Sequence, residues 1–86
     1  MGKQAKLLEG DKDIFAGIHI KVTEPAPKPT AFEAQLRSSI SVWREDGIAG
    51  VWLHLDSAAA SLIPSAIKCG FDFHHAKPGK VSMIRW

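Results

Sequence analysis

The chain has 86 residues, of which 45% are hydrophobic and 23% are charged. This length supports one globular domain, residues 1–86, and the composition excludes a disordered or fibrous protein. The formal net charge is +2 and the basic residues are scattered, which argues against nucleic acid as a partner. The longest apolar runs reach about seven residues, far short of the ~20 that span a bilayer, so we expect no membrane segment.

The N-terminus is polar and lacks the apolar region of a signal peptide, so we expect an intracellular, cytoplasmic protein. We expect residues 1–6 to be disordered. The chain contains a single cysteine, Cys69, which excludes an internal disulfide and agrees with a reducing compartment.

Apolar and polar residues alternate from Ile18 to Val22, a period-two pattern that predicts a strand over residues 17–23. Residues 11–13 before it are typical of a turn. Residues 7–8 either form a short edge strand or fill a gap in the core. Residues 24–29 contain three prolines, which break regular structure and indicate a connector.

A helix is predicted over residues 31–45. Thr30 and Glu33 have the spacing of a capping box, in which each side chain accepts a hydrogen bond from the other's backbone N–H. Gly47 provides a left-handed stop at the other end. The apolar residues between these signals form one helical stripe: Phe32, Leu36, Ile40 and Trp43.

Residues 49–55 are mostly apolar and include a β-branched and an aromatic residue, which predicts a strand that is buried on at least one face and lies at the centre of the sheet. Asp56 or Ser57 can cap a second helix that ends at Gly70. Pro64 leaves two alternatives for this helix. It lies in the first turn, or a loose turn up to about residue 63 precedes the regular helix.

The C-terminal part predicts a β-hairpin, with strands over 71–76 and 81–86 joined by a turn over 77–80. The order of elements is then β-α-β-α-β-β. The fold class is α/β (α+β), a twisted mixed sheet that is mostly antiparallel and carries two helices.

Two histidines, His74 and His75, are the most obvious candidates for chemistry. Neighbouring residues on a strand point to opposite faces, so we expect one ring to face the core and the other to face solvent or a partner. We predict no metal site. Cys69 lies at the expected C-terminus of a helix, where the dipole raises a thiol pKa, so we expect a packed side chain instead of a nucleophile.

Other catalytic and cofactor-binding patterns are missing from the sequence. It contains no pair of carboxylates placed for acid–base work and no glycine-rich phosphate loop. Trp43, Trp52 and Phe73 could stack on bases, but Trp43 lies on the apolar helical stripe. Trp52 alternates with its neighbours and could face the other side of the sheet beneath a helix. We predict no catalytic, cofactor-binding or metal residue in this chain.

An ordered set of short motifs, covering about residue 7 to Trp86, resembles the N-terminal pre-Nudix domain of one subfamily of Nudix hydrolases. That subfamily contains plant ADP-ribose and NADH pyrophosphatases and a related animal protein. The motifs are Leu7-Leu8-Glu9-Gly10, Glu24-Pro25, Leu36-Arg37-Ser38-Ser39, Trp43-Arg44-Glu45, Gly50-Val51-Trp52-Leu53, Gly70-Phe71 and Phe73-His74-His75-Ala76.

The resemblance implies a domain with a GNAT acyltransferase-like fold that precedes a catalytic Nudix domain. The family hydrolyses nucleoside diphosphate derivatives such as ADP-ribose or NADH. Mg²⁺ or Mn²⁺ is held there by the glutamates of G-x5-E-x7-R-E-x2-E-E-x-G, and this motif does not occur in the chain. The resemblance therefore implies a non-catalytic domain without a cofactor of its own, which packs against the catalytic domain and supports a homodimer.

Within this resemblance, we expect Phe71, Phe73, His74 and His75 to face the hydrolase domain or its substrate. The alternative is that Phe71 and Phe73 are core residues on one face of their strand. Two other functions stay open: a free-standing interaction module derived from such a domain, and a degenerate acyltransferase. The second is disfavoured because residues 55–60 lack the glycines and the basic residue of an [RQ]-x-x-G-x-[GA] loop.

Overall fold

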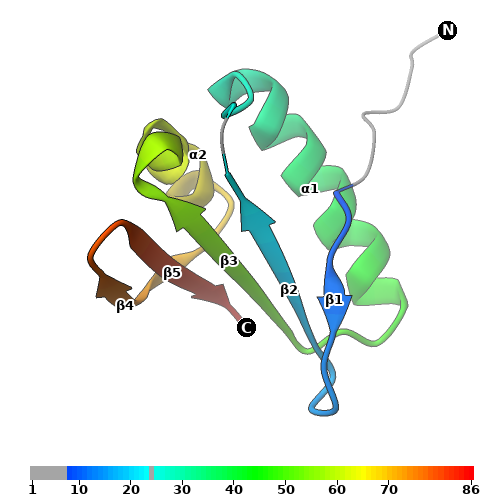
Figure 1. Ribbon diagram of the computed structural model, residues 1–86. Coiled ribbons are helices and arrows are strands. Elements are labelled where there is room, and N and C mark those ends of the chain that lie inside the picture. The colour runs from blue at the N-terminus through cyan, green and yellow to red at the C-terminus, as the bar shows by residue number, and fades with distance from the viewer. Residues whose placement is uncertain (1–7, 24) are drawn as a thin grey trace, which may run out of the picture.

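The computed structural model describes residues 8–23 and 25–86. Five strands form one sheet in the order β1-β2-β3-β5-β4, and the helices lie together behind it in Figure 1. β2 and β3 are parallel, whereas the other three pairings are antiparallel. This arrangement confirms the predicted fold class. The predicted disorder of residues 1–6 lies outside the described residues.

The first two strands are β1 (Asp11–Lys12) and β2 (Gly17–Val22). The predicted turn over 11–13 is wrong in part, because Asp11 and Lys12 pair with β2 as an edge strand. Of the two residues predicted as edge strand or core filling, Leu7 lies outside the described residues. Leu8 packs against the core, and its backbone N–H donates to Ser39 Oγ at 2.8 Å.

The first helix, α1, runs over Pro29–Glu45, and the predicted capping box is wrong. Pro29 has no N–H and a fixed φ that suits the first helical position, so the helix begins one residue before Thr30. The N-cap is Lys28, without a side-chain cap, and Glu33 instead accepts a hydrogen bond from Arg37 at 3.2 Å. The stop is confirmed, since Gly47 has φ +82°.

The central strand β3 (Gly50–Asp56) leads into a 3₁₀ segment, η1 (Ser57–Leu62), and a short helix, α2 (Ile63–Lys68). Each alternative for Pro64 holds in part. The proline lies in the first turn of α2, and a separate segment precedes that helix, although it is the 3₁₀ segment η1, kinked at Ala59, and not a loose turn. Asp56 stands at the N-cap of η1 without a side-chain cap bond. The segment ends at Gly70, whose φ is +90°.

The predicted hairpin is confirmed as β4 (Asp72–Lys77) and β5 (Lys80–Arg85). Pro78 and Gly79 form the turn, in which Gly79 has φ +81°. Such a turn needs a residue with positive φ after the proline. Among the described residues, neither α1 nor α2 has the length and apolar character needed to cross a membrane.

The core lies between the helices and one face of the sheet. Trp43 is 6% exposed, which confirms its predicted place in the core, and Cys69 is also buried. Burial raises the pKa of the Cys69 thiol, so the predicted direction is confirmed although its main cause is burial. The fully buried side chains that form the centre of the core are Phe32, Leu36, Leu53, Leu55, Leu62 and Met83.

Candidate functional site

The face of the sheet opposite α1 and α2 is the candidate functional surface, and we call it the open face. Side chains alternate along a strand, so Val51 and Leu53 point to the helices whereas Trp52 and His54 point to the open face. Trp52 is half-buried there, and the prediction that a helix covers it is wrong because both helices pack on the other face.

Four side chains form a continuous hydrogen-bonded chain across the open face. Asp13 Oδ2 lies 2.9 Å from His19 Nε2, and His19 Nδ1 lies 3.0 Å from His54 Nε2. His54 Nδ1 lies 2.8 Å from Ser82 Oγ. The chain joins the β1–β2 turn, β2, β3 and β5, and we call it the histidine chain.

The register of the strands creates the histidine chain. Parallel pairing sets His19 of β2 opposite Trp52 of β3, so His54 lies one step along the same face. Antiparallel pairing sets His54 opposite Ser82 of β5. The rings of His19 and His54 are parallel within 3°, with centroids 5.3 Å apart.

The protons of the histidine chain can all run in one direction with both rings neutral. Ser82 then donates to His54 Nδ1, His54 Nε2–H donates to His19 Nδ1, and His19 Nε2–H donates to the carboxylate of Asp13. Burial is the main cause that lowers the pKa of His54, and repulsion from His19, whenever that ring is protonated, lowers it further, so the neutral form of His54 is favoured.

Asp13, in the β1–β2 turn, is the last acceptor of the histidine chain. Its Oδ1 accepts the backbone N–H groups of Phe15 and Gly17, both at 2.8 Å. The hydrogen bond from Gly17 lowers the pKa of this carboxyl most, and the bonds from His19 and Phe15 add to it. One carboxylate therefore fixes the turn and orients an imidazole.

The order Ser–His–His–Asp resembles a nucleophile with a base and an orienting acid, but Ser82 is only 1% exposed. A nucleophilic hydroxyl must reach a bound substrate, and this one faces His54 inside the sheet. The geometry therefore supports a structural role for the histidine chain, which ties three strands to one turn.

His74 and His75 differ from the prediction that they point to opposite faces. The pairing of β4 with β5 shifts between Phe73 and His75, so a β-bulge places both rings together. Their Nδ1 atoms lie 2.8 Å apart, and both side chains are exposed. The ring of His74 also contacts Trp52, with centroids 4.6 Å apart.

A metal site needs further ligands beside these two rings. In residues 8–23 and 25–86, no three His, Cys, Asp or Glu side chains come together to hold an ion. His74 and His75 therefore form a pair of exposed imidazoles next to Trp52.

The two phenylalanines of the predicted interface differ in their exposure to solvent. Phe71 is 3% exposed in the core, as the alternative interpretation has it, so it offers no surface to a partner. Phe73 is 55% exposed on β4. A partner can reach Phe73, His74 and His75, and their role in an interface stays a prediction.

An open pocket of about 480 Å³ lies where the β1–β2 turn meets the end of the chain. Phe15 and Trp86 flank it, and they are 80% and 78% exposed. His19 and Trp52 form its base, with parallel rings 5.6 Å apart. No local sequence pattern indicates this site, because its residues come together through the pairing of β3 with both β2 and β5.

A family model for the Nudix hydrolase domain matches residues 8–86. The chain belongs to the Nudix hydrolase family. It is 37% identical over 84 residues to Nudix hydrolase 7 and 39% identical over 84 residues to Nudix hydrolase 8, both from Arabidopsis thaliana. It is 34% identical over 83 residues to the mouse protein nucleoside diphosphate-linked moiety X motif 6.

These matches cover most of this chain but a small part of each relative. They include 98% of the chain for both plant proteins and 92% for the mouse protein. The chain spans only 29%, 23% and 26% of the length of those three Nudix proteins, respectively. Most of each relative therefore has no counterpart in these 86 residues.

Proposed function

We propose that this chain is the N-terminal, non-catalytic domain of a Nudix hydrolase, with a GNAT-like fold, and that its open face packs against the catalytic domain. The observation that carries the proposal is the aromatic surface around Trp52, Trp86 and Phe15 on a sheet face that neither α1 nor α2 covers. Exposed apolar patches of this kind mark interaction sites. The greater length of the relatives supports a second domain as the occupant.

The donor groups of this chain do not fit the divalent cation of the parent hydrolase. Mg²⁺ and Mn²⁺ prefer carboxylate oxygens, whereas the side chains that converge on the open face are mainly imidazoles. The chain has four glutamates, none adjacent to another, so it lacks the Glu-Glu of the family motif: Glu9, Glu24, Glu33 and Glu45. The proposed hydrolysis of ADP-ribose, NADH or a related compound therefore belongs to the remainder of the parent protein.

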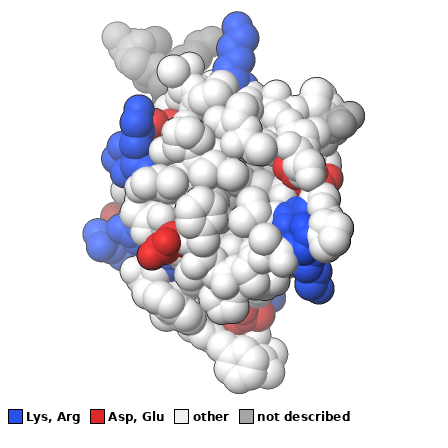
Figure 2. Space-filling model, turned by 90° about the vertical axis from the view of Figure 1, so that its left-hand side faces the viewer, with Lys and Arg blue, Asp and Glu red and all other residues white. Residues whose placement is uncertain are grey.

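The distribution of charge on one face of the molecule suits a protein partner better than nucleic acid. Figure 2 shows one face of the molecule, on which Lys and Arg lie singly near the margins and the centre is mostly uncharged. A nucleic-acid site needs a continuous basic surface. The face in this view therefore has no such continuous basic surface.

The edge strand β4 supports a second part of the proposal, the formation of a homodimer. All six residues of β4 are exposed, and its outer edge has no neighbouring strand in the described sheet. Exposed edges can pair with a second copy. In light scattering coupled to size exclusion, we expect a dimer at high concentration, and a monomer at every concentration would contradict this part.

The packing proposal is tested by hydroxyl-radical footprinting of the 86-residue chain and of the longer natural protein that contains it. We expect Trp52, Trp86 and Phe15 to be modified less in the longer protein. Ile67 is 50% exposed on α2 and serves as the control, since its modification should not change. Equal modification of the three aromatic residues in both proteins would refute packing through the open face.

The non-catalytic proposal is tested by turnover of ADP-ribose and NADH with Mg²⁺ or Mn²⁺. We expect release of AMP by the longer protein and none by the 86-residue chain. Turnover by the short chain would overturn the proposal. The natural reading frame offers a further test, because a stop codon directly after Trp86 would instead favour a free-standing interaction module.

A further inference from the structure

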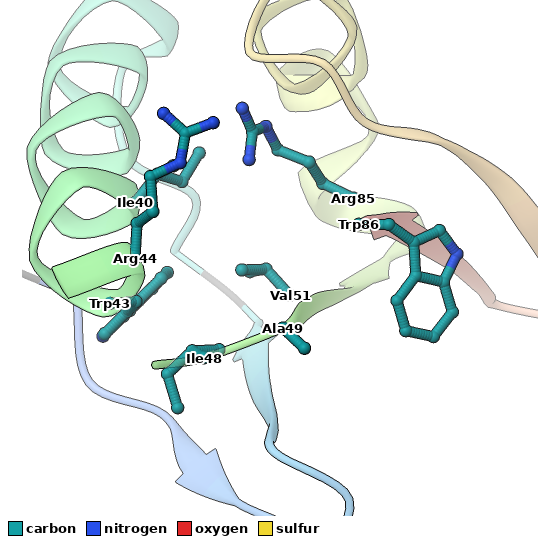
Figure 3. A pocket seen from close by; sticks show the side chains of 8 residues that line it. All are labelled: Ile40, Trp43, Arg44, Ile48, Ala49, Val51, Arg85 and Trp86. Atoms are coloured by element: carbon teal, nitrogen blue, oxygen red, sulfur yellow. The ribbon is translucent and has the colours of Figure 1, made fainter. Parts of the chain in front are cut away.

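A second pocket, of about 180 Å³, lies between α1 and β5 on the helix side of the sheet. Trp43 and Val51 form its apolar base, and Figure 3 shows the side chains of Arg44 and Arg85 facing one another across it. Arg44 comes from the last turn of α1, and Arg85 comes from the end of β5. Two guanidinium groups thus meet beside an apolar surface.

Arg85 is held in place by the backbone around α2. Its Nε–H donates to the carbonyl oxygen of Cys69 at 2.9 Å, and within the described residues the two terminal nitrogens donate no hydrogen bond. Gly70 makes room for this side chain, because a Cβ at that position would lie 3.0 Å from Nε. The orientation of Arg85 is therefore set before any ligand arrives.

Neither guanidinium has a carboxylate partner in residues 8–23 and 25–86, where the two ion pairs are Asp13 with His19 and Glu33 with Arg37. Residues 1–7 contain no acidic side chain, so Glu24 is the one acidic residue outside the described part.

Two like charges that face one another repel. An anion between them converts repulsion into attraction. A carboxylate has one negative charge and two oxygens, which a single guanidinium satisfies. A phosphate group carries a charge of about −1.5 to −2 and three oxygens, and it matches two guanidinium groups.

We propose that Arg44 and Arg85 bind a phosphate group of a small molecule in this pocket. The proposal goes beyond the accessory role described above and rests on different charged residues, although Trp86 lines this pocket as well as the pocket on the open face. Arg37 adds no free charge, because its guanidinium is paired with Glu33.

The test is an NMR titration of the 86-residue chain with inorganic phosphate, pyrophosphate and acetate at constant ionic strength. We expect saturable shifts of the Arg85 Nε–H and the Trp43 indole signals, with a dissociation constant of about 1 mM or lower for pyrophosphate. Absence of a saturable shift overturns the proposal. Acetate binding as tightly as phosphate also overturns it, because the site would then take a carboxylate from a protein segment.

Three variants assign the site to its residues. Arg44→Gln and Arg85→Gln should each weaken pyrophosphate binding about tenfold or more, because each removes charged hydrogen-bond donors. Lys80→Gln removes the same charge at the other end of β5, and it should change binding by less than about twofold. Equal weakening by Lys80→Gln would show attraction by net charge alone and would refute the site.

The variants must keep their fold for this comparison to hold. Arg44 is exposed and its side chain makes no ion pair within the described residues, so Arg44→Gln should unfold close to the wild-type temperature. Arg85→Lys keeps the charge but loses the bond to the Cys69 carbonyl. It should bind pyrophosphate more weakly than the wild type, and wild-type affinity in this variant would contradict the proposed role of the oriented guanidinium.

Discussion

Replacing Ser82 with alanine tests whether the histidine chain stabilises the domain. Ser82 is 1% exposed and its Oγ lies 2.8 Å from His54 Nδ1, so Ser82→Ala removes one buried hydrogen bond with little change in volume. Such a bond contributes about 0.5–1.5 kcal/mol, and an imidazole nitrogen left without a partner adds a further cost. His54 is half-buried and can recruit water, so we expect a loss of about 1–2 kcal/mol in the free energy of unfolding.

Thermal unfolding followed by circular dichroism measures this loss. For a domain of this size, each kcal/mol shifts Tm by roughly 4–8 °C, so Ser82→Ala should lower Tm by about 4–16 °C. The matched control is Ser41→Ala on the exposed side of α1, which should change stability by less than about 0.5 kcal/mol. In a His54→Leu background, Ser82→Ala should cost less than about 0.5 kcal/mol, because its partner is already gone.

Two results would refute this reasoning. If Ser82→Ala unfolds at the wild-type temperature, the hydroxyl contributes nothing to stability. If the variant loses the same free energy with and without His54, the loss comes from packing of the serine and not from the bond to the imidazole.

Three further predictions concern the same face and the core beneath it. Burial lowers the pKa of His54 from 6.5, so the stability that neutral His54 contributes is complete above pH 6.5 and is lost as pH falls through its folded pKa. Urea titrations at several pH values should show this fall in the free energy of unfolding, and His54→Gln should remove it. The hydrogen bond from Gly17 lowers the pKa of Asp13 from 3.8, so the stability that its carboxylate contributes is present above pH 3.8 and is lost as pH falls below it. Asp13→Ala should abolish this acid-dependent loss of stability, and an unchanged loss would contradict the role of the carboxylate. Leu53→Ala removes a fully buried side chain from the central strand and should cost about 2–5 kcal/mol in guanidinium unfolding, whereas a loss below about 1 kcal/mol would show that the core there is loosely packed.

The sequence predicted most elements because their signals are local. Alternation from Ile18 to Val22, the apolar stripe that includes Leu36 and Trp43, and the Pro-Gly turn of the hairpin each depend on neighbouring residues. The predicted start of the first helix was wrong because two local signals point to different residues. The helix begins at Pro29, whose fixed φ suits the first helical position, and not after a capping box at Thr30.

The resemblance of its motifs placed the chain among the Nudix hydrolases, as the family match confirms. The sites could not be predicted in the same way. His19 and His54 are 35 positions apart and meet through the register between β2 and β3, which no local pattern encodes. The bulge that turns His74 beside His75 is likewise a property of strand pairing. Arg44 and Arg85 face one another because α1 packs beside the end of β5, so tertiary structure decided where the chemistry of this chain converges.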